Sequence, residues 1–290
     1  MDIAYFPGCS LHSMAREYDR SARLVCERLG ISLVEVEDWN CCGATAAHSL
    51  DHELALGLGA RNLSIVHRMG RDAVTTPCAG CFSRLKTAAH ELAHPGSLAR
   101  SLEERLDTDF SRLPGVTHLL QLLMEARGPR GLAQPVVKPL KGLRVAAYYG
   151  CLLTRPRHVV QFDDPEQPSS MDGLLRALGA ETVKWSHKAE CCGGSFAASE
   201  PGIVVDLGGQ VLEAACRAGA EAVAVACPMC QVNLDSRQDE IRKERVDVHS
   251  LPVIYFTQLM GLAYGYPPRE LGLRRLLVTP FPLLKGKGYF

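Results

Sequence analysis

The sequence predicts an α/β protein built from two homologous lobes, each a small parallel sheet covered by helices. Three observations support this fold class. A pattern of five cysteines occurs twice, short apolar segments alternate with segments of helical periodicity, and a stretch rich in proline and glycine at 128–142 separates the halves. Alternation of strand and helix along a chain is typical of parallel sheets. The 290 residues, 47% of them hydrophobic, are enough to build a core in each lobe.

Ten of the 12 cysteines form the repeat. Each copy has a single cysteine, then Cys-Cys-Gly, then Cys-x-x-Cys. The N-terminal cysteine set comprises Cys9, Cys41, Cys42, Cys78 and Cys81, and the C-terminal cysteine set comprises Cys151, Cys191, Cys192, Cys227 and Cys230. Matching cysteines lie 149 or 150 positions apart, except the first pair at 142, so one insertion near 163–170 accounts for the difference. A period of this length indicates two lobes rather than a solenoid, and we predict domains over 1–140 and 141–290.

Strand-length apolar segments precede the cysteine groups in both halves. In the first half, we predict strands over 3–6, 32–36 and 73–76, and helices over 13–29, over 51–68 and around Cys81. In the second half, we predict strands over 144–149, 182–185 and 221–226, and helices over 171–178, 202–218 and 229–242.

Every predicted strand runs into a cysteine group. The C-terminal ends of parallel strands share one edge of the sheet, which is where open α/β sheets bind their ligands. Five thiols from three loops can therefore converge in each lobe. Gly43 and Gly193, which come directly after the double cysteines, would let the backbone approach closely there.

The composition limits the choice of partner and compartment. The numbers of basic and acidic residues are equal, at 32 each, and the pI is near 7.1, which argues against nucleic acid as the main partner. The first residues lack the basic region of a secretion signal, and no segment approaches the ~18 apolar residues of a membrane span. We therefore expect a soluble, cytoplasmic protein. In that reducing compartment, paired thiols serve more often as metal ligands or redox groups than as structural disulfides.

Three kinds of site could use five convergent cysteines: an iron-sulfur cluster, a zinc ion or a thiol–disulfide exchange centre. A structural zinc ion and a cubane cluster each take four thiolates, so a fifth favours a larger or distorted cluster, or a cluster with a thiol beside it. The sequence contains no ferredoxin-type C-x2-C-x2-C-x3-C-P run, no G-x-G-x-x-G after a predicted strand and no P-loop. Electrons for any redox reaction must then come from another subunit.

The repeated pattern resembles the signature of the CCG domain family, and the surrounding residues resemble the HdrB subunit of heterodisulfide reductase. The segments that carry this likeness are Tyr5-Phe6-Pro7-Gly8-Cys9-Ser10, Tyr148-Tyr149-Gly150-Cys151-Leu152-Leu153-Thr154-Arg155-Pro156 and Lys188-Ala189-Glu190-Cys191-Cys192-Gly193-Gly194-Ser195. The resemblance implies that each cysteine set binds a noncubane 4Fe-4S cluster and that the two clusters face each other across the lobe interface.

The resemblance also implies a reaction and partners. A disulfide, either the coenzyme M–coenzyme B heterodisulfide or an analogous one, would be cleaved between the clusters, each sulfur being taken by an iron of one cluster. Electrons would come from a ferredoxin-like iron-sulfur subunit, itself fed by a flavin-containing subunit. Two other functions remain open at this point: electron transfer in a 2-hydroxy-acid oxidation complex, and a zinc-stabilised assembly factor.

Several residues outside the two sets are candidates for accessory roles. His12, His187 and Lys188 could donate protons to departing thiolates, and Arg155 and Arg157 could bind an anionic group, with surface roles as the alternative for each. The basic and aromatic segment 251–290 could dock an electron-donating subunit or pack as an extension of the second lobe. Cys26 and Cys216 lie on apolar helical faces and are predicted to be buried structural thiols.

Overall fold

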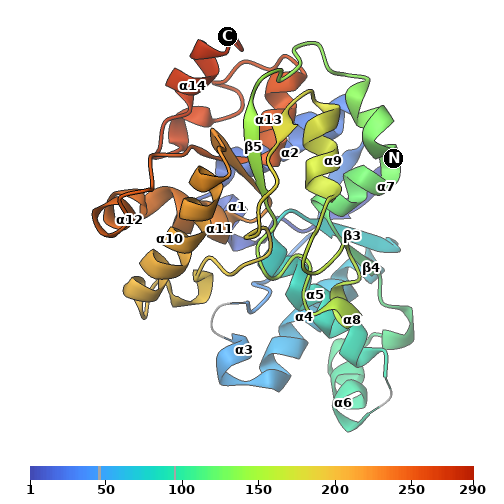
Figure 1. Cartoon of the computed structure of the whole chain (residues 1–290). Coiled ribbons are helices and arrows are strands. Elements are labelled where there is room, and N and C mark those ends of the chain that lie inside the picture. Colours follow the sequence, from blue (N-terminus) through green and yellow to red (C-terminus); the bar gives the residue numbers. More distant parts are fainter. Residues whose placement is uncertain (45–46, 95) are drawn as a thin grey trace.

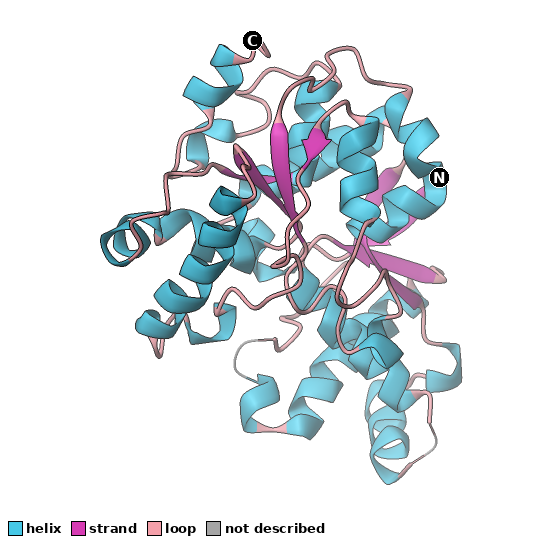
Figure 2. Ribbon diagram, viewed as in Figure 1, coloured by secondary structure: helices cyan, strands magenta, loops and turns pink. Residues whose placement is uncertain are grey.

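The computed structural model describes residues 1–44, 47–94 and 96–290. Within them, the chain forms two four-stranded sheets of parallel strands covered by helices (Figures 1 and 2). The first sheet has the strand order β2-β1-β3-β4, and the second has the matching order β6-β5-β7-β8. This architecture confirms the predicted α/β fold with two homologous lobes.

The elements alternate as the sequence indicates. The strands are β1 (Asp2–Tyr5), β2 (Ser32–Glu35), β3 (Ala73–Thr76) and β4 (Gly115–His118) in the first lobe, and β5 (Arg144–Tyr148), β6 (Glu181–Thr182), β7 (Ala222–Val225) and β8 (Val253–Tyr255) in the second. The helices of the first lobe are α1 (Gly8–His12), α2 (Arg16–Arg28), α3 (Ala47–Leu50), α4 (His52–Arg68), α5 (Ala79–Leu92), α6 (Ser97–Leu106) and α7 (Leu119–Ala133). Those of the second lobe are α8 (Arg157–Val160), α9 (Ser170–Ala177), α10 (Pro201–Arg217), α11 (Pro228–Ser236), α12 (Gln238–Glu244), α13 (Phe256–Ala263) and α14 (Phe281–Gly286).

Local chemistry explains where the longer helices begin. The carboxylate of Asp51 accepts a hydrogen bond of 2.9 Å from the Leu54 backbone N–H and so caps α4. Helix α10 begins at Pro201, whose missing N–H is not needed in a first turn. The central strands β5 and β7 are buried over nearly their whole length, because helices cover both faces of a parallel sheet.

The structure differs from the predicted elements in five of its strands and helices. A fourth strand extends each sheet, β4 beside β3 and β8 beside β7, where the sequence pattern predicts none. The predicted helix over 13–29 begins only at Arg16, as α2, and a separate short helix, α1, precedes it; the Ala15 backbone N–H between them bonds back to the Ser10 carbonyl. The predicted helix over 229–242 is divided between α11 and α12. The predicted strand over 182–185 shrinks to β6, which pairs with β5 through only two residues.

Each lobe packs one of its helices against a helix of the other lobe. Helix α7 of the first lobe lies against α9 of the second, and α13 of the second lobe lies against α2 of the first (Figure 1). Since α7 and α13 each come after the fourth strand of a sheet, these are equivalent contacts made in both directions. The hydroxyls of Ser21 and Thr257 are hydrogen-bonded at 2.7 Å across this interface, and the Tyr264 hydroxyl donates to the Leu132 carbonyl at 2.9 Å.

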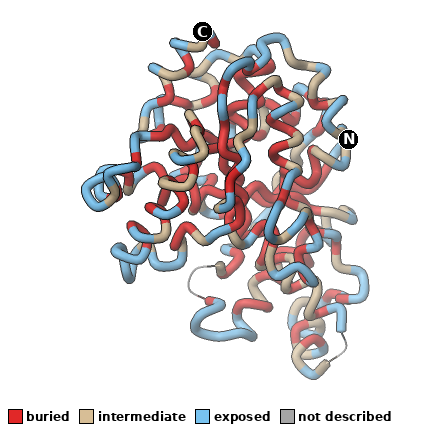
Figure 3. The backbone as a smooth tube through the Cα atoms, in the orientation of Figure 1, coloured by how far each residue is buried: buried red, intermediate tan, exposed pale blue. Residues whose placement is uncertain are grey.

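The buried hydrophobic residues of both lobes form one continuous cluster. Figure 3 shows the buried residues along the backbone of the central part of the molecule. The lobes are therefore packed into one body. Among the described residues, none of the helices combines the length and the apolar character that crossing a membrane requires.

Candidate functional site

The cysteine groups lie where the strands of each sheet end. Cys9 and Cys151 come after β1 and β5, and the Cys-x-x-Cys pairs come after β3 and β7, with their second cysteines inside the first turns of α5 and α11. The structure brings each double cysteine to its Cys-x-x-Cys pair. The sulfurs of Cys42 and Cys81 are 3.3 Å apart in the first lobe, and those of Cys192 and Cys230 are 3.5 Å apart in the second. The five thiols of each set therefore belong to one region of their lobe, as predicted.

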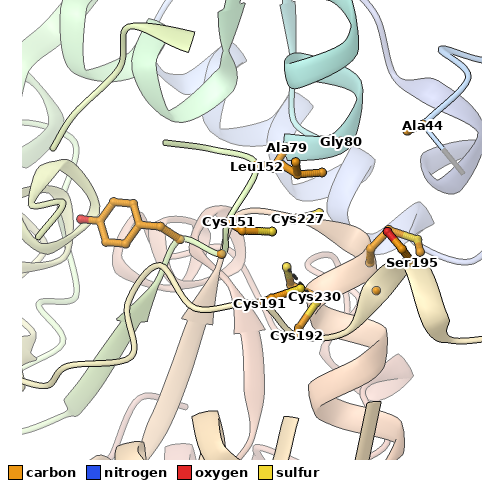
Figure 4. Close-up of a pocket in the computed structure, with 14 residues that line it drawn as sticks. Ala44, Ala79, Gly80, Cys151, Leu152, Cys191, Cys192, Ser195, Cys227 and Cys230 are labelled. Atoms are coloured by element: carbon orange, nitrogen blue, oxygen red, sulfur yellow. Dashed lines mark hydrogen bonds between the residues drawn. The ribbon is translucent and has the colours of Figure 1, made fainter. Parts of the chain in front are cut away.

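All five members of the C-terminal set line one pocket (Figure 4). Its remaining walls are small or apolar and include Leu152 and Met229 from the same lobe. Ala79 and Gly80, which lie between the cysteines of the first lobe's Cys-x-x-Cys pair, close the pocket from the other side. The pocket thus lies at the lobe interface, directly beside the N-terminal set.

Glycine is required immediately before the first cysteine of each set. Gly8 and Gly150 have φ of +72° and +69°, in the left-handed region that favours glycine. A Cβ at Gly8 would lie 2.8 Å from the Cys81 sulfur, and one at Gly150 would lie 3.0 Å from the Cys230 sulfur. The sequence pattern draws attention to Gly43 and Gly193 instead. Gly193 also has a positive φ, of +75°, but its missing side chain makes room for the backbone of Val204.

Hydrogen bonds between thiols move their pKa values in opposite directions. A hydrogen bond from Cys151 lowers the pKa of Cys191 to about 6. In the first lobe, a hydrogen bond to Cys42 raises the pKa of Cys41, and the pKa of Cys42 falls because Cys41 and Cys81 both bond to it. Each set can therefore hold negative charge at selected sulfurs. Among the described residues, no three His, Cys, Asp or Glu side chains are grouped closely enough to hold a single metal ion.

The two sets meet at the lobe interface. Hydrogen bonds from Cys230 and, across the interface, from Cys78 lower the pKa of Cys227, which places the first cysteines of the two Cys-x-x-Cys pairs near each other. The backbone before each of these cysteines is also tied across the interface. The fully buried His118 places its Nε2 3.0 Å from the Pro77 carbonyl and 3.0 Å from the Ala226 carbonyl.

The protonation of His118 is determined by its third contact. Its Nδ1 accepts a hydrogen bond of 3.1 Å from the Leu120 backbone N–H, so the proton of the neutral ring is on Nε2 and can be shared by the two carbonyls. Burial lowers the pKa of His118 to about 4, which keeps the ring neutral. Sequence reasoning missed His118. The only available signal was the similarity of 116–122 to 253–259, in which position 118 corresponds to Tyr255.

The accessory candidates are engaged elsewhere. His12 pairs with Glu35 at 2.9 Å, and the buried Lys188 forms an ion pair of 2.8 Å with Asp172. His187 shares a hydrogen bond of 2.8 Å with the neighbouring Ser186. None of these three candidates lines the pocket of the C-terminal set. Lys188 nevertheless lies beside a cysteine loop, since its carbonyl accepts hydrogen bonds from the Tyr149 and Gly150 backbone N–H groups. The roles of the three residues in proton transfer stay predictions.

The two arginines and the remaining cysteines also lie away from the pocket. Arg155 pairs with Glu166 at 2.8 Å, and Arg157 is exposed in the first turn of α8, so neither lines the pocket. Cys26 is buried as predicted, and burial raises its pKa to about 12. Cys216 is only half-buried and lies 3.8 Å from the His249 carbonyl.

The C-terminal segment packs onto the body of the protein. Arg275 forms an ion pair of 2.8 Å with Glu17 of the first lobe, and Lys287 forms one of 2.8 Å with Glu221. The Tyr289 side chain is buried. These contacts agree with the prediction of a packed extension of the second lobe.

Comparison with known proteins agrees with this geometry. Residues 3–86 and 145–235 each match the cysteine-rich CCG domain. The chain belongs to the CCG family. It is 29% identical to the HdrB subunit of the ferredoxin:CoB-CoM heterodisulfide reductase of Methanosarcina mazei, over 97% of this chain and 95% of that one. The resemblance to HdrB stated from the sequence is thereby confirmed.

Other relatives widen the range of functions in the family. The chain is 33% identical to the 8-methylmenaquinol:fumarate reductase membrane anchor subunit of Wolinella succinogenes, over 96% of this chain and 97% of that one. It is 28% identical to an HdrB-like protein of Archaeoglobus profundus, over 95% and 94% of the two chains. The crystal structure of a hypothetical protein from Helicobacter pylori has the same fold, with a TM-score of 0.74 at 14% identity, over 96% of this chain and 52% of that one.

Proposed function

We propose that the chain is the iron-sulfur catalytic subunit of a disulfide reductase of the heterodisulfide reductase type. One observation carries the proposal. Two full five-cysteine sets meet at the lobe interface, in a chain that is similar to the HdrB subunit of that enzyme over almost its whole length. The proposed ligands are the ten cysteines of the two sets.

The donor sets suit iron-sulfur clusters. Thiolates are the usual ligands of these clusters, and each lobe provides five from three loops. When bound, two clusters, which we propose to be of the noncubane 4Fe-4S type, supply electrons one at a time. The glycines before Cys9 and Cys151 keep side chains away from the sulfurs. The buried hydroxyls of Tyr18 and Tyr255 also fit a group held nearby, because they find no acceptor within the described part of the chain.

The reaction that suits this arrangement is R–S–S–R′ + 2 e⁻ + 2 H⁺ → R–SH + R′–SH. A disulfide needs two electrons, and two redox groups on opposite sides of the bond can provide one each. The chain's own contribution is the pocket at the interface. Leu152, Met229 and Ala79 give it apolar walls, which would exclude water from a cluster held by the five cysteines that line it. We propose as substrate a disulfide such as the coenzyme M–coenzyme B heterodisulfide or an analogous molecule.

The electron source would be a separate subunit. The sequence contains no ferredoxin-type cysteine run and no dinucleotide-binding motif after a strand. We propose a ferredoxin-like iron-sulfur subunit as the direct donor and a flavin-containing subunit behind it. A cytoplasmic location accords with the same proposal, since free thiols persist in a reducing compartment.

A second function is favoured by the relative from Wolinella succinogenes. That relative matches this chain over nearly its whole length and is named as a subunit of an 8-methylmenaquinol:fumarate reductase. The chain could therefore transfer electrons within a complex that reduces a different substrate. Anaerobic assays of the complex with a disulfide, with fumarate and with lactate or glycolate would separate this function, and the 2-hydroxy-acid alternative, from disulfide reduction.

Substitution of one cysteine in each set tests the proposal. We expect Cys41→Ser and Cys191→Ser each to lower disulfide reduction by at least about 100-fold, since each removes a ligand. Cys216→Ser is the matched control, because this half-buried thiol lies outside both sets. Disulfide reduction that survives both substitutions at the wild-type rate would overturn the proposal.

A further inference from the structure

Two tyrosines from different lobes are stacked at the lobe interface. Tyr18 comes from α2 of the first lobe, and Tyr255 ends β8 of the second. Their rings are 4.0 Å apart between centroids and nearly parallel, at 11°. Both side chains are fully buried. They therefore lie in the same interface at which the two cysteine sets meet.

The hydroxyls of these two tyrosines have no hydrogen-bond partner among the residues that the structure describes. Other buried tyrosines of the chain do have one. The Tyr148 hydroxyl donates to the Glu190 carbonyl at 2.7 Å, that of Tyr149 to the Asp172 carboxylate at 2.8 Å, and that of Tyr264 to the Leu132 carbonyl at 2.9 Å. A buried hydroxyl without an acceptor is costly, and a pair of them in one place indicates an acceptor that the chain itself does not provide.

The surroundings favour sulfur as the acceptor. The register of the second sheet pairs Tyr255 with Val225, two residues before Cys227. Burial raises the pKa of the Tyr18 hydroxyl, and negative charge at Cys227, Cys78 and Cys230 raises it further. Burial likewise raises the pKa of Tyr255, with contributions from Glu17, Tyr18 and the same Cys227 and Cys78. Both phenols are thus protonated donors, and thiols of both sets are close to them.

We propose that the Tyr18 and Tyr255 hydroxyls donate hydrogen bonds to sulfur atoms of the clusters at the lobe interface. The inference rests on the proposed function, since it needs clusters held by the two sets. Hydrogen bonds to sulfur stabilise the reduced, more negative form of a cluster and so raise its reduction potential. The two tyrosines would make electron transfer into the clusters easier and keep the interface dry.

The substitutions Tyr18→Phe and Tyr255→Phe test this role, because they remove a hydroxyl and keep the stacked ring. Tyr264→Phe is the matched control, since its hydroxyl already has a backbone acceptor at the same interface. The measurements are iron content, reduction potentials from a titration followed by electron paramagnetic resonance, and resonance Raman spectra of the Fe–S stretches in H₂O and D₂O. All three use the cluster-loaded protein, and none depends on activity.

We expect each variant to bind as much iron as the wild type and to lower the reduced-to-oxidised ratio at a set potential by up to about tenfold, which is 59 mV for one electron. The double variant should shift further than either single one, and the D₂O sensitivity of the Fe–S stretches should diminish with each hydroxyl removed. Tyr264→Phe should change neither the potential nor the spectra. Loaded variants with wild-type potentials and unchanged D₂O shifts would overturn the role of the tyrosines and leave the proposed function standing. A wild-type protein that binds no iron would overturn both.

Discussion

The two cysteine sets occupy the same edge of the same kind of sheet but differ in exposure. In the N-terminal set, Cys9 and Cys41 are exposed, and in the C-terminal set their counterparts Cys151 and Cys191 are half-buried. The second set lines a pocket that the first lobe closes with Ala79 and Gly80. A duplicated sheet can therefore present one set toward solvent and enclose the other.

The two lobes also differ in the segment after the first cysteine of each set. In the first lobe, Cys9 stands at the start of α1, and the chain then enters α2. In the second lobe, the longer connection between Cys151 and α9 includes α8, which packs against α5 of the first lobe. The second lobe thus adds a contact with the first lobe close to its first cysteine, which the described residues of the first lobe do not make to a similar extent in return.

The largest effect is expected from removing the His118 side chain, which links the backbone of the two cysteine sets. His118→Ala leaves the Pro77 and Ala226 carbonyls without their donor, at about 1–3 kcal/mol for each buried group. We expect the free energy of unfolding, measured by urea denaturation, to fall by about 2–4 kcal/mol. His12→Ala is the control, because its ion pair with Glu35 is at the surface and should be worth under about 1 kcal/mol. An equal decrease in the free energy of unfolding for both variants would contradict the proposed role of His118 in linking the two lobes.

Glycine substitutions test the two sets separately. Gly8→Ala and Gly150→Ala each place a Cβ against a sulfur, 2.8 Å from Cys81 or 3.0 Å from Cys230, at a positive φ. We expect a loss of about 2–3 kcal/mol in the free energy of unfolding and a loss of iron from the affected lobe alone. Gly202→Ala, where a Cβ would meet nothing within 4 Å, should leave both unchanged. Iron lost equally from both lobes would show that the sets are not independent.

The pKa of His118 predicts how stability depends on pH. Burial lowers it to about 4 from an unfolded value near 6.5, so in that window the unfolded chain binds a proton that the folded chain does not. The free energy of unfolding should fall as the pH drops from 7 to 5, by up to about 1.4 kcal/mol per unit from this residue. His118→Gln keeps a side-chain donor but cannot titrate. Parallel pH curves for the wild type and this variant would contradict the assignment.

Thiol reactivity sharpens the comparison further. In the metal-free protein at pH 7, Cys191 should react with iodoacetamide at least about tenfold faster than Cys41, although Cys41 is the more exposed of the two. The reason is that the hydrogen bond from Cys151 lowers the pKa of Cys191 to about 6, while the bond to Cys42 raises the pKa of Cys41. Mass spectrometry of the modified peptides measures both rates. Faster modification of Cys41 would show that exposure outweighs the hydrogen bonds.

The sequence was sufficient to predict the sheets and the cysteine sets, because both depend on local patterns. Strand-length apolar segments ending in cysteine place the sulfurs at one sheet edge regardless of how the lobes pack. The fourth strands were missed because neither β4 nor β8 leads into a cysteine group, which marked the end of every predicted strand. His118, Tyr18 and Tyr255 were missed for a different reason, because their roles arise from contacts between lobes. The domain limits at 1–140 and 141–290 and the ligand role of the ten cysteines stay predictions.

The accessory candidates show what closeness in sequence fails to predict, which is the partner that a charged side chain binds. His12 and Lys188 have side chains suited to proton transfer, and their nearness to cysteines in sequence made them plausible. The structure gives each a carboxylate partner from another segment, Glu35 and Asp172, at 2.9 and 2.8 Å. Nearness along the chain does not tell which of two nearby groups a charged side chain will bind.

The most direct test of the central claim is the metal content of the wild-type protein. The chain should be produced and purified without oxygen and analysed for iron, acid-labile sulfide and zinc per polypeptide. Two clusters of four irons predict about eight irons per chain and no zinc. About four irons with one zinc, or zinc alone, would contradict the claim that both lobes hold iron-sulfur clusters.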